Sequence, residues 1–183
     1  MREPAAVTEQ PGAIVPDDKD WTWVLDRPCP ECGFDTGAIE VSGVGDLVRD
    51  NASAWQRVLA RPGAAERRAP DRWSPLEYAC HVRDVFGVYL GRLDAMLTED
   101  GPHYANWDQD ATAIEDDYAS QSPVAVAVEL TRAGSALAAR FDTVEADQWQ
   151  RTGFRSDGAS FTIDTFARYF IHDPVHHLWD VRG

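Results

Sequence analysis

The sequence predicts an all-α protein: an antiparallel four-helix bundle that follows a short irregular N-terminal extension with a CxxC turn. Four stretches of about 15–25 residues repeat apolar side chains with a helical period, and alternating strand patterns are nearly absent. One short and two long connections join these stretches, an arrangement typical of helical bundles. A chain of 183 residues can bury such a core without disulfides.

Composition divides the chain into three parts. Residues 1–20 are rich in proline, glycine and acids and are expected to form a flexible tail. Residues 21–45 form the extension with the CPxCG turn, and residues 46–183 carry the helical pattern of the bundle. No secretory signal and no apolar run of about 18 residues is visible, so we expect a cytoplasmic protein whose cysteines are reduced.

The chain is strongly acidic. Seventeen Lys+Arg against 31 Asp+Glu give a formal net charge of −14. Such a surface repels a phosphate backbone, so nucleic acid is not an expected partner, and no segment indicates a membrane partner. Lys19 is the only lysine and alanine is abundant, a bias typical of a GC-rich bacterial genome. The number of subunits is left open, with a homodimer as one alternative.

The first two helices have clear boundaries. One runs from about Asp46 to Ala60, where the following Arg-Pro-Gly stops it. The second begins at Ser74, because Ser74 as N-cap, Pro75 in the first turn and Glu77 three residues later form a capping box before an apolar stripe. It ends near residues 99–102, which are rich in helix-stopping Gly and Pro.

The second half of the chain holds a long connection and two further helices. Residues 101–121 are acidic and aromatic without a clear period, and a loop of this length in a compact domain is usually functional or disordered. Ser122 opens the third helix, and the last helix follows residue 160. Pro174 in that helix cannot donate a backbone hydrogen bond, so the helix either kinks there or begins there. A helical stripe upstream favours the kink.

The CPxCG turn offers Cys29 and Cys32 as a candidate second metal or redox site. The turn is half of a zinc knuckle and needs a second Cys or His pair, which Cys80 and His81 could supply only if the fold brought them near. The alternative is a reduced turn whose prolines and glycine fix a tight corner. A redox role is less favoured, because no βαβ pattern surrounds the turn.

Three of the five histidines lie within the last helix. His172 and His176 are four residues apart, so both imidazoles leave one helix face and suit a shared zinc, nickel, copper or iron ion. His177 points about 100° away and is the weaker candidate. Asp180 lies one turn after His176 and is a candidate outer-shell partner for its ring. The alternative is a surface helix that happens to be rich in histidine.

His81 is the one ligand-type residue on another long helix that could face this pair. Metal sites in helical bundles are assembled from facing helices, which favours His81 as a third ligand. The alternative is a hydrogen-bonded core histidine beside an apolar stripe.

Four motifs resemble one known family. They are the stretch from Trp73 to Val82 with its His81, the NWDQD run of residues 106–110, the SDG turn of residues 156–158, and the HDxxHHxxD pattern that starts at His172. Over about residues 46–182 the chain resembles the DinB-like superfamily, which includes the YfiT-type proteins and the metal domain of mycothiol-dependent maleylpyruvate isomerase. The CPxCG segment resembles an N-terminal addition of some actinobacterial members.

The resemblance implies a four-helix bundle that holds one divalent metal, zinc or nickel, on three side chains. Carried onto this chain, these ligands fall on His81, His172 and His176. In the maleylpyruvate isomerase branch a carboxylate can take one of the three places, whereas this assignment uses three histidines.

The resemblance also implies a function, because characterised members are thiol S-transferases that activate bacillithiol, mycothiol or glutathione. A three-histidine zinc keeps an open position at which a thiol would lose its proton. We therefore expect a metal-dependent transferase that adds a low-molecular-weight thiol, above all mycothiol, to an electrophilic small molecule. Arg168 would pair with a substrate carboxylate, and Trp107 and Asp110 would cover the site. The alternative is a non-catalytic, stress-associated metal-binding or interaction protein.

Overall fold

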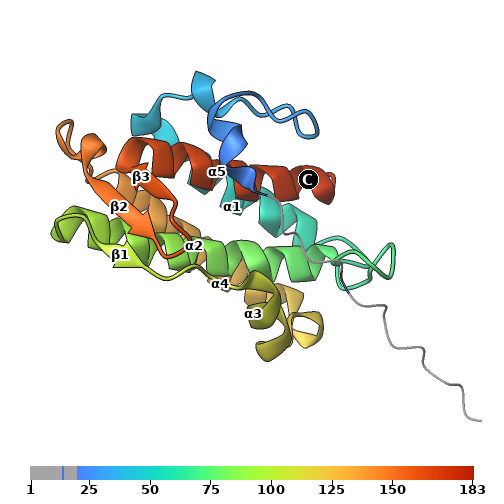
Figure 1. The fold of residues 1–183 in the computed structure, drawn as a ribbon. Helices are drawn as coiled ribbons and strands as arrows, with labels where there is room; N and C mark the ends of the chain where they lie inside the picture. The colour runs from blue at the N-terminus through green and yellow to red at the C-terminus, as the bar shows by residue number, and fades with distance from the viewer. Residues whose placement is uncertain (1–13, 15–19) are drawn as a thin grey trace, which may run out of the picture.

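The computed structural model describes residue 14 and residues 20–183, so most of the expected tail lies outside the described residues. Four long helices form a bundle, as expected, and one short helix lies against it (Figure 1). The helices are α1 (Val44–Leu59), α2 (Pro75–Thr98), α3 (Gln109–Glu115), α4 (Pro123–Phe141) and α5 (Ile163–Asp180). None of the described helices is long and apolar enough to cross a membrane.

The helix directions refine the expected antiparallel arrangement. Around the bundle the order is α1, α4, α2, α5, and contacts between neighbours fix the directions. Between α1 and α4 the contacts join Gly45 to Asp142 and Gln56 to Thr131, and between α2 and α4 they join Arg83 to Glu129 and Arg140 to Asp94. Between α2 and α5 they join His81 to Asp173 and Tyr89 to Phe166. Between α1 and α5 they join Asn51 to Pro174 and Arg61 to Val181. Thus α1/α4 and α2/α5 are antiparallel, whereas α2/α4 and α1/α5 are parallel.

Local signals in the sequence placed the helix starts correctly. The Ser74 backbone N–H donates to Glu77 Oε2 at 2.8 Å and the Glu77 N–H donates to Ser74 Oγ at 3.2 Å, which completes the predicted capping box of α2. Helix α5 continues through Pro174, so the proline lies inside the helix and does not start it. The Asn51 side chain donates to the Pro174 carbonyl at 2.7 Å and ties α1 to this part of α5.

A small sheet is the main feature that the sequence did not predict, so the all-α prediction needs this correction. Its strands β1 (His103–Tyr104), β2 (Thr152–Arg155) and β3 (Ser160–Thr162) are ordered β1-β2-β3. Strand β2 pairs in parallel with β1 and antiparallel with β3. Strands this short show no recognisable period. The sheet joins the two long connections of the chain to each other.

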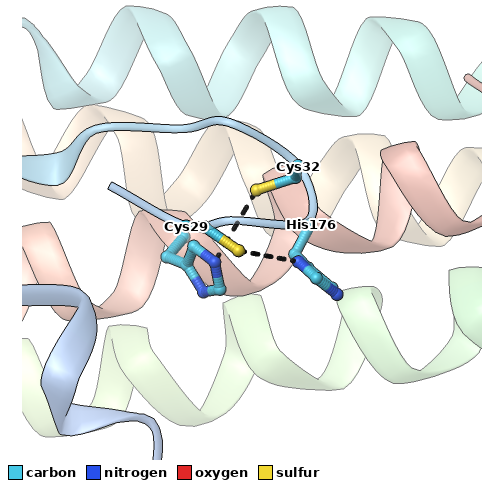
Figure 2. A group of neighbouring side chains, drawn as sticks. Cys29, Cys32 and His176 are labelled. Atoms are coloured by element: carbon cyan, nitrogen blue, oxygen red, sulfur yellow. Dashed lines mark hydrogen bonds between the residues drawn. The ribbon is translucent and has the colours of Figure 1, made fainter. Parts of the chain in front are cut away.

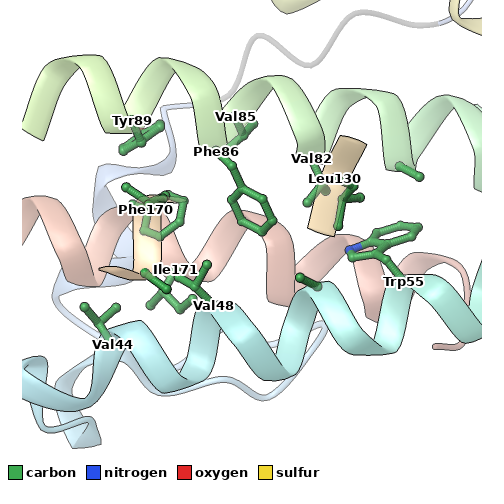
Figure 3. Close-up of a cluster of buried hydrophobic side chains, with 14 of the residues drawn as sticks. Val44, Val48, Trp55, Val82, Val85, Phe86, Tyr89, Leu130, Phe170 and Ile171 are labelled. Carbon is green, nitrogen blue, oxygen red and sulfur yellow. The ribbon is translucent and has the colours of Figure 1, made fainter. Parts of the chain in front are cut away.

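The core lies between the four long helices. Its buried side chains come from all of them and include Val44, Val48, Trp55, Val82, Val85, Phe86, Tyr89, Leu130, Phe170 and Ile171 (Figure 3). At Gly134 in α4 the helices approach so closely that a Cβ atom would lie 3.1 Å from both Ala52 and Phe86. A glycine there lets α1, α2 and α4 pack without a side chain between them.

The N-terminal extension is built of three short 3₁₀ helices, η1 (Trp21–Leu25), η2 (Thr36–Ala38) and η3 (Val41–Gly43). It lies along the outer side of α5 (Figure 1). Arg168 of α5 donates to the carbonyls of Thr36 at 2.6 Å and Ile39 at 3.0 Å, and it also pairs with Asp164 at 2.8 Å. Arg168 therefore ties the extension to the bundle.

Candidate metal centres

Adjacent residues of α5 contribute to two different groups of ligand-type side chains. Asp173 and His177 lie with His81 of α2, and we call these three residues the interhelical triad. His172 and His176 lie with Cys29 and Cys32 of the extension, and we call these four residues the cysteine cluster.

The sequence-based set of His81, His172 and His176 is therefore divided between two groups in the described part of the chain. Successive residues of a helix point about 100° apart, so the pair at 172 and 176 cannot share the direction of the pair at 173 and 177. The pair that lies with His81 of α2 is Asp173 with His177, one residue later than the pair that the sequence suggested.

The donor atoms of the interhelical triad are spaced as ligands of one ion would be. His81 Nε2 lies 3.4 Å from Asp173 Oδ1 and 3.5 Å from Oδ2, and His177 Nε2 lies 3.8 Å from Oδ1. These distances exceed an ordinary hydrogen bond, which spans about 2.7–3.2 Å. Two donors about 2.1 Å from one zinc-like ion at a tetrahedral angle lie roughly 3.4 Å apart.

Two buried atoms of the triad, Asp173 Oδ1 and His81 Nδ1, have no hydrogen-bond partner among the described residues. An ion at the triad would satisfy the carboxylate oxygen. Burial alone would raise the pKa of Asp173, but the neighbouring His81 and His177 outweigh it and hold this pKa at about 2. The group is thus an ionised carboxylate beside two imidazoles, a donor set that fits a divalent metal.

Neighbouring side chains orient both histidines of the triad. His177 Nδ1 lies 2.9 Å from Asp180 Oδ2, so an Nδ1–H that donates there leaves Nε2 unprotonated, with a lone pair that is available to a metal ion beside Asp173. Asp180 had been expected behind His176, but its nearest oxygen is 3.9 Å from His176 Nε2. The ring of Trp107 stacks on His81 with centroids 5.4 Å apart and planes 9° apart.

The cysteine cluster joins the CPxCG turn to the outer face of α5. Cys29 Sγ lies 3.7 Å from His176 Nδ1, and Cys32 Sγ lies 3.7 Å from His172 Nε2. Figure 2 shows the loop that carries the two cysteines, with the Cys29 sulfur directed at His176. Burial lowers the pKa of His172 to about 4, and it also lowers that of His176. Both rings are therefore neutral at pH 7, the state in which imidazole binds metals.

The sequence indicated Cys29 with Cys32 and His172 with His176 as two separate candidate pairs, and did not indicate that they meet. The missing second pair of the knuckle was sought at Cys80 and His81. Cys80 is instead buried in the bundle core, 3.5 Å from Gln121 Oε1, and His81 belongs to the triad. The spacing HxxxH is itself a known second half of a two-cysteine, two-histidine site, and that signal was available.

A large cavity of about 1380 Å³ opens over the triad. Asp173, His177 and Asp180 line it, together with the expected substrate residues Trp107 and Asp110. The extension contributes residues 20–22 and 31 to the lining, and His172 and His176 line the cavity as well. Arg168 is not among the described residues that line it and has the carbonyl partners given above. Its expected role toward a substrate carboxylate has no support in this position.

These features define a four-helix-bundle protein with a candidate metal centre between two helices and a cavity above it. The family model described as the DinB superfamily matches residues 16–181, so the chain belongs to the DinB superfamily. The match includes the extension as well as the bundle. It confirms the resemblance drawn from the sequence motifs.

One similar solved structure is that of YfiT from Bacillus subtilis, described as "a probable metal-dependent hydrolase with an unusual four-helix bundle topology". The two chains share 15% sequence identity at a TM-score of 0.68, and the alignment covers 79% of this chain and 89% of YfiT. At this identity the likeness establishes the fold. No match is found among curated proteins.

Proposed function

We propose that the protein is a metal-dependent transferase that activates a low-molecular-weight thiol, with mycothiol as the best candidate, for addition to an electrophilic small molecule. The observation that carries the proposal is the convergence of His81, Asp173 and His177 at distances suited to a shared divalent ion, with Asp173 and His177 in the lining of the cavity. Zinc or nickel suits two imidazoles and one carboxylate. When bound, such an ion would lower the pKa of a thiol at its open position.

The chain's own residues would hold and shield the reactants. Asp180 fixes the ring of His177, and the stacked Trp107 fixes that of His81. The Trp107 indole N–H donates to Thr112 Oγ1 at 2.8 Å, which anchors the connection that passes over the triad. These contacts keep the ligands aligned before substrate arrives, which reduces the reorganisation that binding requires.

The size of the cavity favours two reactants over one. Sites for a single small molecule usually measure about 300–1000 Å³. A cavity of about 1380 Å³ has room for a thiol of several hundred daltons and for an electrophile beside it.

The walls of the cavity favour a sugar-bearing thiol. Its described lining has eight carboxylates and two arginines, with tryptophans at positions 21, 73, 107 and 179. Carboxylates accept hydrogen bonds from hydroxyl groups, and aromatic rings cover the apolar faces of sugars. Mycothiol carries hydroxyl groups and no carboxylate, whereas glutathione and bacillithiol carry carboxylates that this wall would repel.

The test is a conjugation assay with metal-loaded protein, a chromogenic haloarene and each of the three thiols. We expect the rate with mycothiol to exceed the other two, to disappear after chelation, and to be lost in His81→Ala. His103→Ala is the matched control, because His103 stacks on Phe154 in the sheet and does not line the cavity. Rates that are equal with and without metal for every thiol would refute the proposal and favour a binding protein.

The same ligand set could activate water, the chemistry named in the description of YfiT. An ester and amide hydrolysis screen with the same protein samples separates the two reactions. Hydrolysis without thiol conjugation would replace the transferase by a hydrolase at the same triad.

A further inference from the structure

The cysteine cluster lies outside the triad and has no part in the proposed function. Its four donor atoms lie within 4.8 Å of one another. Cys29, His172 and His176 are buried, and Cys32 is partly buried. Four soft or borderline donors, two thiols and two imidazoles, meet at one point between the extension and α5 (Figure 2).

We infer that Cys29, Cys32, His172 and His176 form a closed, structural zinc site that fastens the extension to the bundle. The distances support a tetrahedral ion. With Zn–S near 2.3 Å and Zn–N near 2.05 Å, a tetrahedral angle separates sulfur and nitrogen by about 3.6 Å. The two sulfur–nitrogen distances are both 3.7 Å.

The turn is built to present both sulfurs to one side. The Cys29 N–H donates to the Phe34 carbonyl at 2.9 Å, and the Gly33 N–H donates to the Cys29 carbonyl at 2.9 Å. Gly33 has a φ of 74°, a left-handed conformation that favours glycine, and it reverses the chain directly after Cys32. These backbone contacts hold the CPxCG turn in a shape that directs both sulfurs toward α5.

Glu31, between the two cysteines, supplies an outer partner for one of the histidines. Its Oε2 lies 3.3 Å from His176 Nε2. A proton on Nε2 that is directed at Glu31 leaves Nδ1 unprotonated, and Nδ1 is the atom that faces Cys29. The turn therefore provides two ligands and also selects the ring form of a third.

The site would be structural because all four positions are filled by side chains. Structural zinc sites are closed and tetrahedral, whereas catalytic sites keep one position open. On binding, each thiol loses its proton to solvent and forms a sulfur–zinc bond, while the neutral imidazoles bind without losing a proton. The ion would link a turn at residues 29–32 to a helix about 140 residues later in the chain, in the manner of a cross-link.

The site also has a consequence for the cavity. Trp21 packs on both His172 and His176, with ring centroids 5.3 Å from each, and Trp21 and Glu31 line the cavity. Fastening the extension therefore holds one wall of the cavity in position.

The first experiment uses the full chain, purified under reducing conditions, loaded with zinc and freed of loose metal. Elemental analysis is expected to give about two equivalents per chain. Cys29→Ser/Cys32→Ser should remove one equivalent, and His81→Ala/His177→Ala should remove the other. Cys80→Ala is the matched control for cysteine loss, since Cys80 lies in the core, and it should keep both.

Cobalt substitution of the wild-type chain tests the ligand identity without any variant. Two thiolates and two imidazoles give the visible bands of tetrahedral cobalt and a near-ultraviolet sulfur-to-cobalt band. We expect the sulfur band in the wild type and in His81→Ala/His177→Ala. Its absence from the wild type, or a Cys29–Cys32 disulfide in protein that was kept reduced, would overturn the inference.

The two experiments separate this inference from the proposed function. Loss of thiol conjugation with an intact sulfur-to-cobalt band would refute only the transferase. A missing band in a chain that retains conjugation and one zinc would refute only the structural site.

Discussion

The two sides of α5 differ in what they hold against the same helix. Toward α2, Asp173 and His177 meet a single histidine and leave room for a further ligand below the cavity. Toward the extension, His172 and His176 meet two cysteines that complete a four-donor set. The difference teaches that an HDxxHH pattern on one helix can place two candidate ligand pairs, one residue apart, against two different neighbours. The pair that faces α2 is suited to hold a reactive metal ion, and the pair that faces the extension is suited to link the extension to the bundle.

Replacing the neighbouring His176 and His177 by alanine, one at a time, should give the largest effects. His177→Ala is expected to reduce the rate of thiol conjugation by more than about 100-fold. Losing an outer-shell partner reduces activity by roughly 10–100-fold, and losing a ligand should reduce it further. It should keep the cobalt–thiolate band. His176→Ala should lose that band and retain metal at the triad. Conjugation kinetics and cobalt spectra of both variants decide the assignment, and identical losses in both would mean one site only.

Removing the two thiols should affect stability. If the zinc acts as a cross-link, Cys29→Ser/Cys32→Ser should lower the free energy of unfolding by about 2–4 kcal/mol. For a domain of this size that corresponds to roughly 4–16 °C in melting temperature. Calorimetry of the wild type with and without a zinc chelator provides the control. The chelator should lower the wild-type midpoint and leave the variant nearly unchanged.

Asp180→Asn should weaken the triad selectively. An amide can donate to His177 Nδ1, which would place the ring proton on Nε2, the atom that faces Asp173. We expect the triad's metal affinity or the conjugation rate to fall by about 10–100-fold. Titration of the metal-free protein with zinc measures the first quantity. Unchanged affinity and unchanged rate would remove Asp180 from the site.

A pH experiment measures how much the ionised Glu77 carboxylate contributes to stability. Burial raises the pKa of Glu77, but hydrogen bonds from Arg67 and Ser74 outweigh this and hold it below its usual value. The stabilisation by ionised Glu77 is therefore present above the pKa of the unfolded state, which is near 4.3. It is lost as the pH falls through the lower pKa that Glu77 has in the folded state. Glu77→Gln should lose about 1–2 kcal/mol at pH 7. Denaturant unfolding should show this difference shrinking below pH 4, and a constant difference would contradict the assignment.

The smallest expected effect concerns Arg168. Because its guanidinium bonds to the carbonyls of Thr36 and Ile39, Arg168→Ala should cost about 0.5–1.5 kcal/mol of stability. The KM for thiol and electrophile should stay within about twofold. A large rise in KM with unchanged stability would restore the substrate role that the sequence suggested.

The sequence was sufficient where local chemistry decides the structure. The capping box of Ser74 and Glu77 started α2 at the correct residue, and the apolar periods located the four long helices. The strands could not be predicted, because segments of two to four residues carry no period and depend on pairing between distant loops. The helix order likewise depends on packing, since it pairs α2 with α4 in parallel.

The sequence identified most side chains of the candidate site, but it did not specify which residues of α5 lie beside His81. His81 and Asp180 belong to it, but the pair on α5 is Asp173 with His177. A helical pattern gives the angle between residues without fixing which face meets which neighbour. In the maleylpyruvate isomerase branch of the family a carboxylate can take one of the three ligand places, and Asp173 fits that pattern. The partner of Cys29 and Cys32 required a contact across about 140 residues of chain, which spacing alone does not specify.

The parallel pairing of α2 with α4 has a consequence for how this protein could diversify. Since α4 must begin at the same end of the bundle as α2, the connection over residues 99–122 has to travel back along the whole length of α2. On this return path it passes His81, and Trp107, Asp108 and Asp110 line the cavity. The roof of the site is thus an obligatory part of the topology, and between the buried Pro102 and Tyr118 none of its residues is fully buried. Changes in residues 103–117 would therefore alter the roof of the cavity and leave the buried side chains of the core in place.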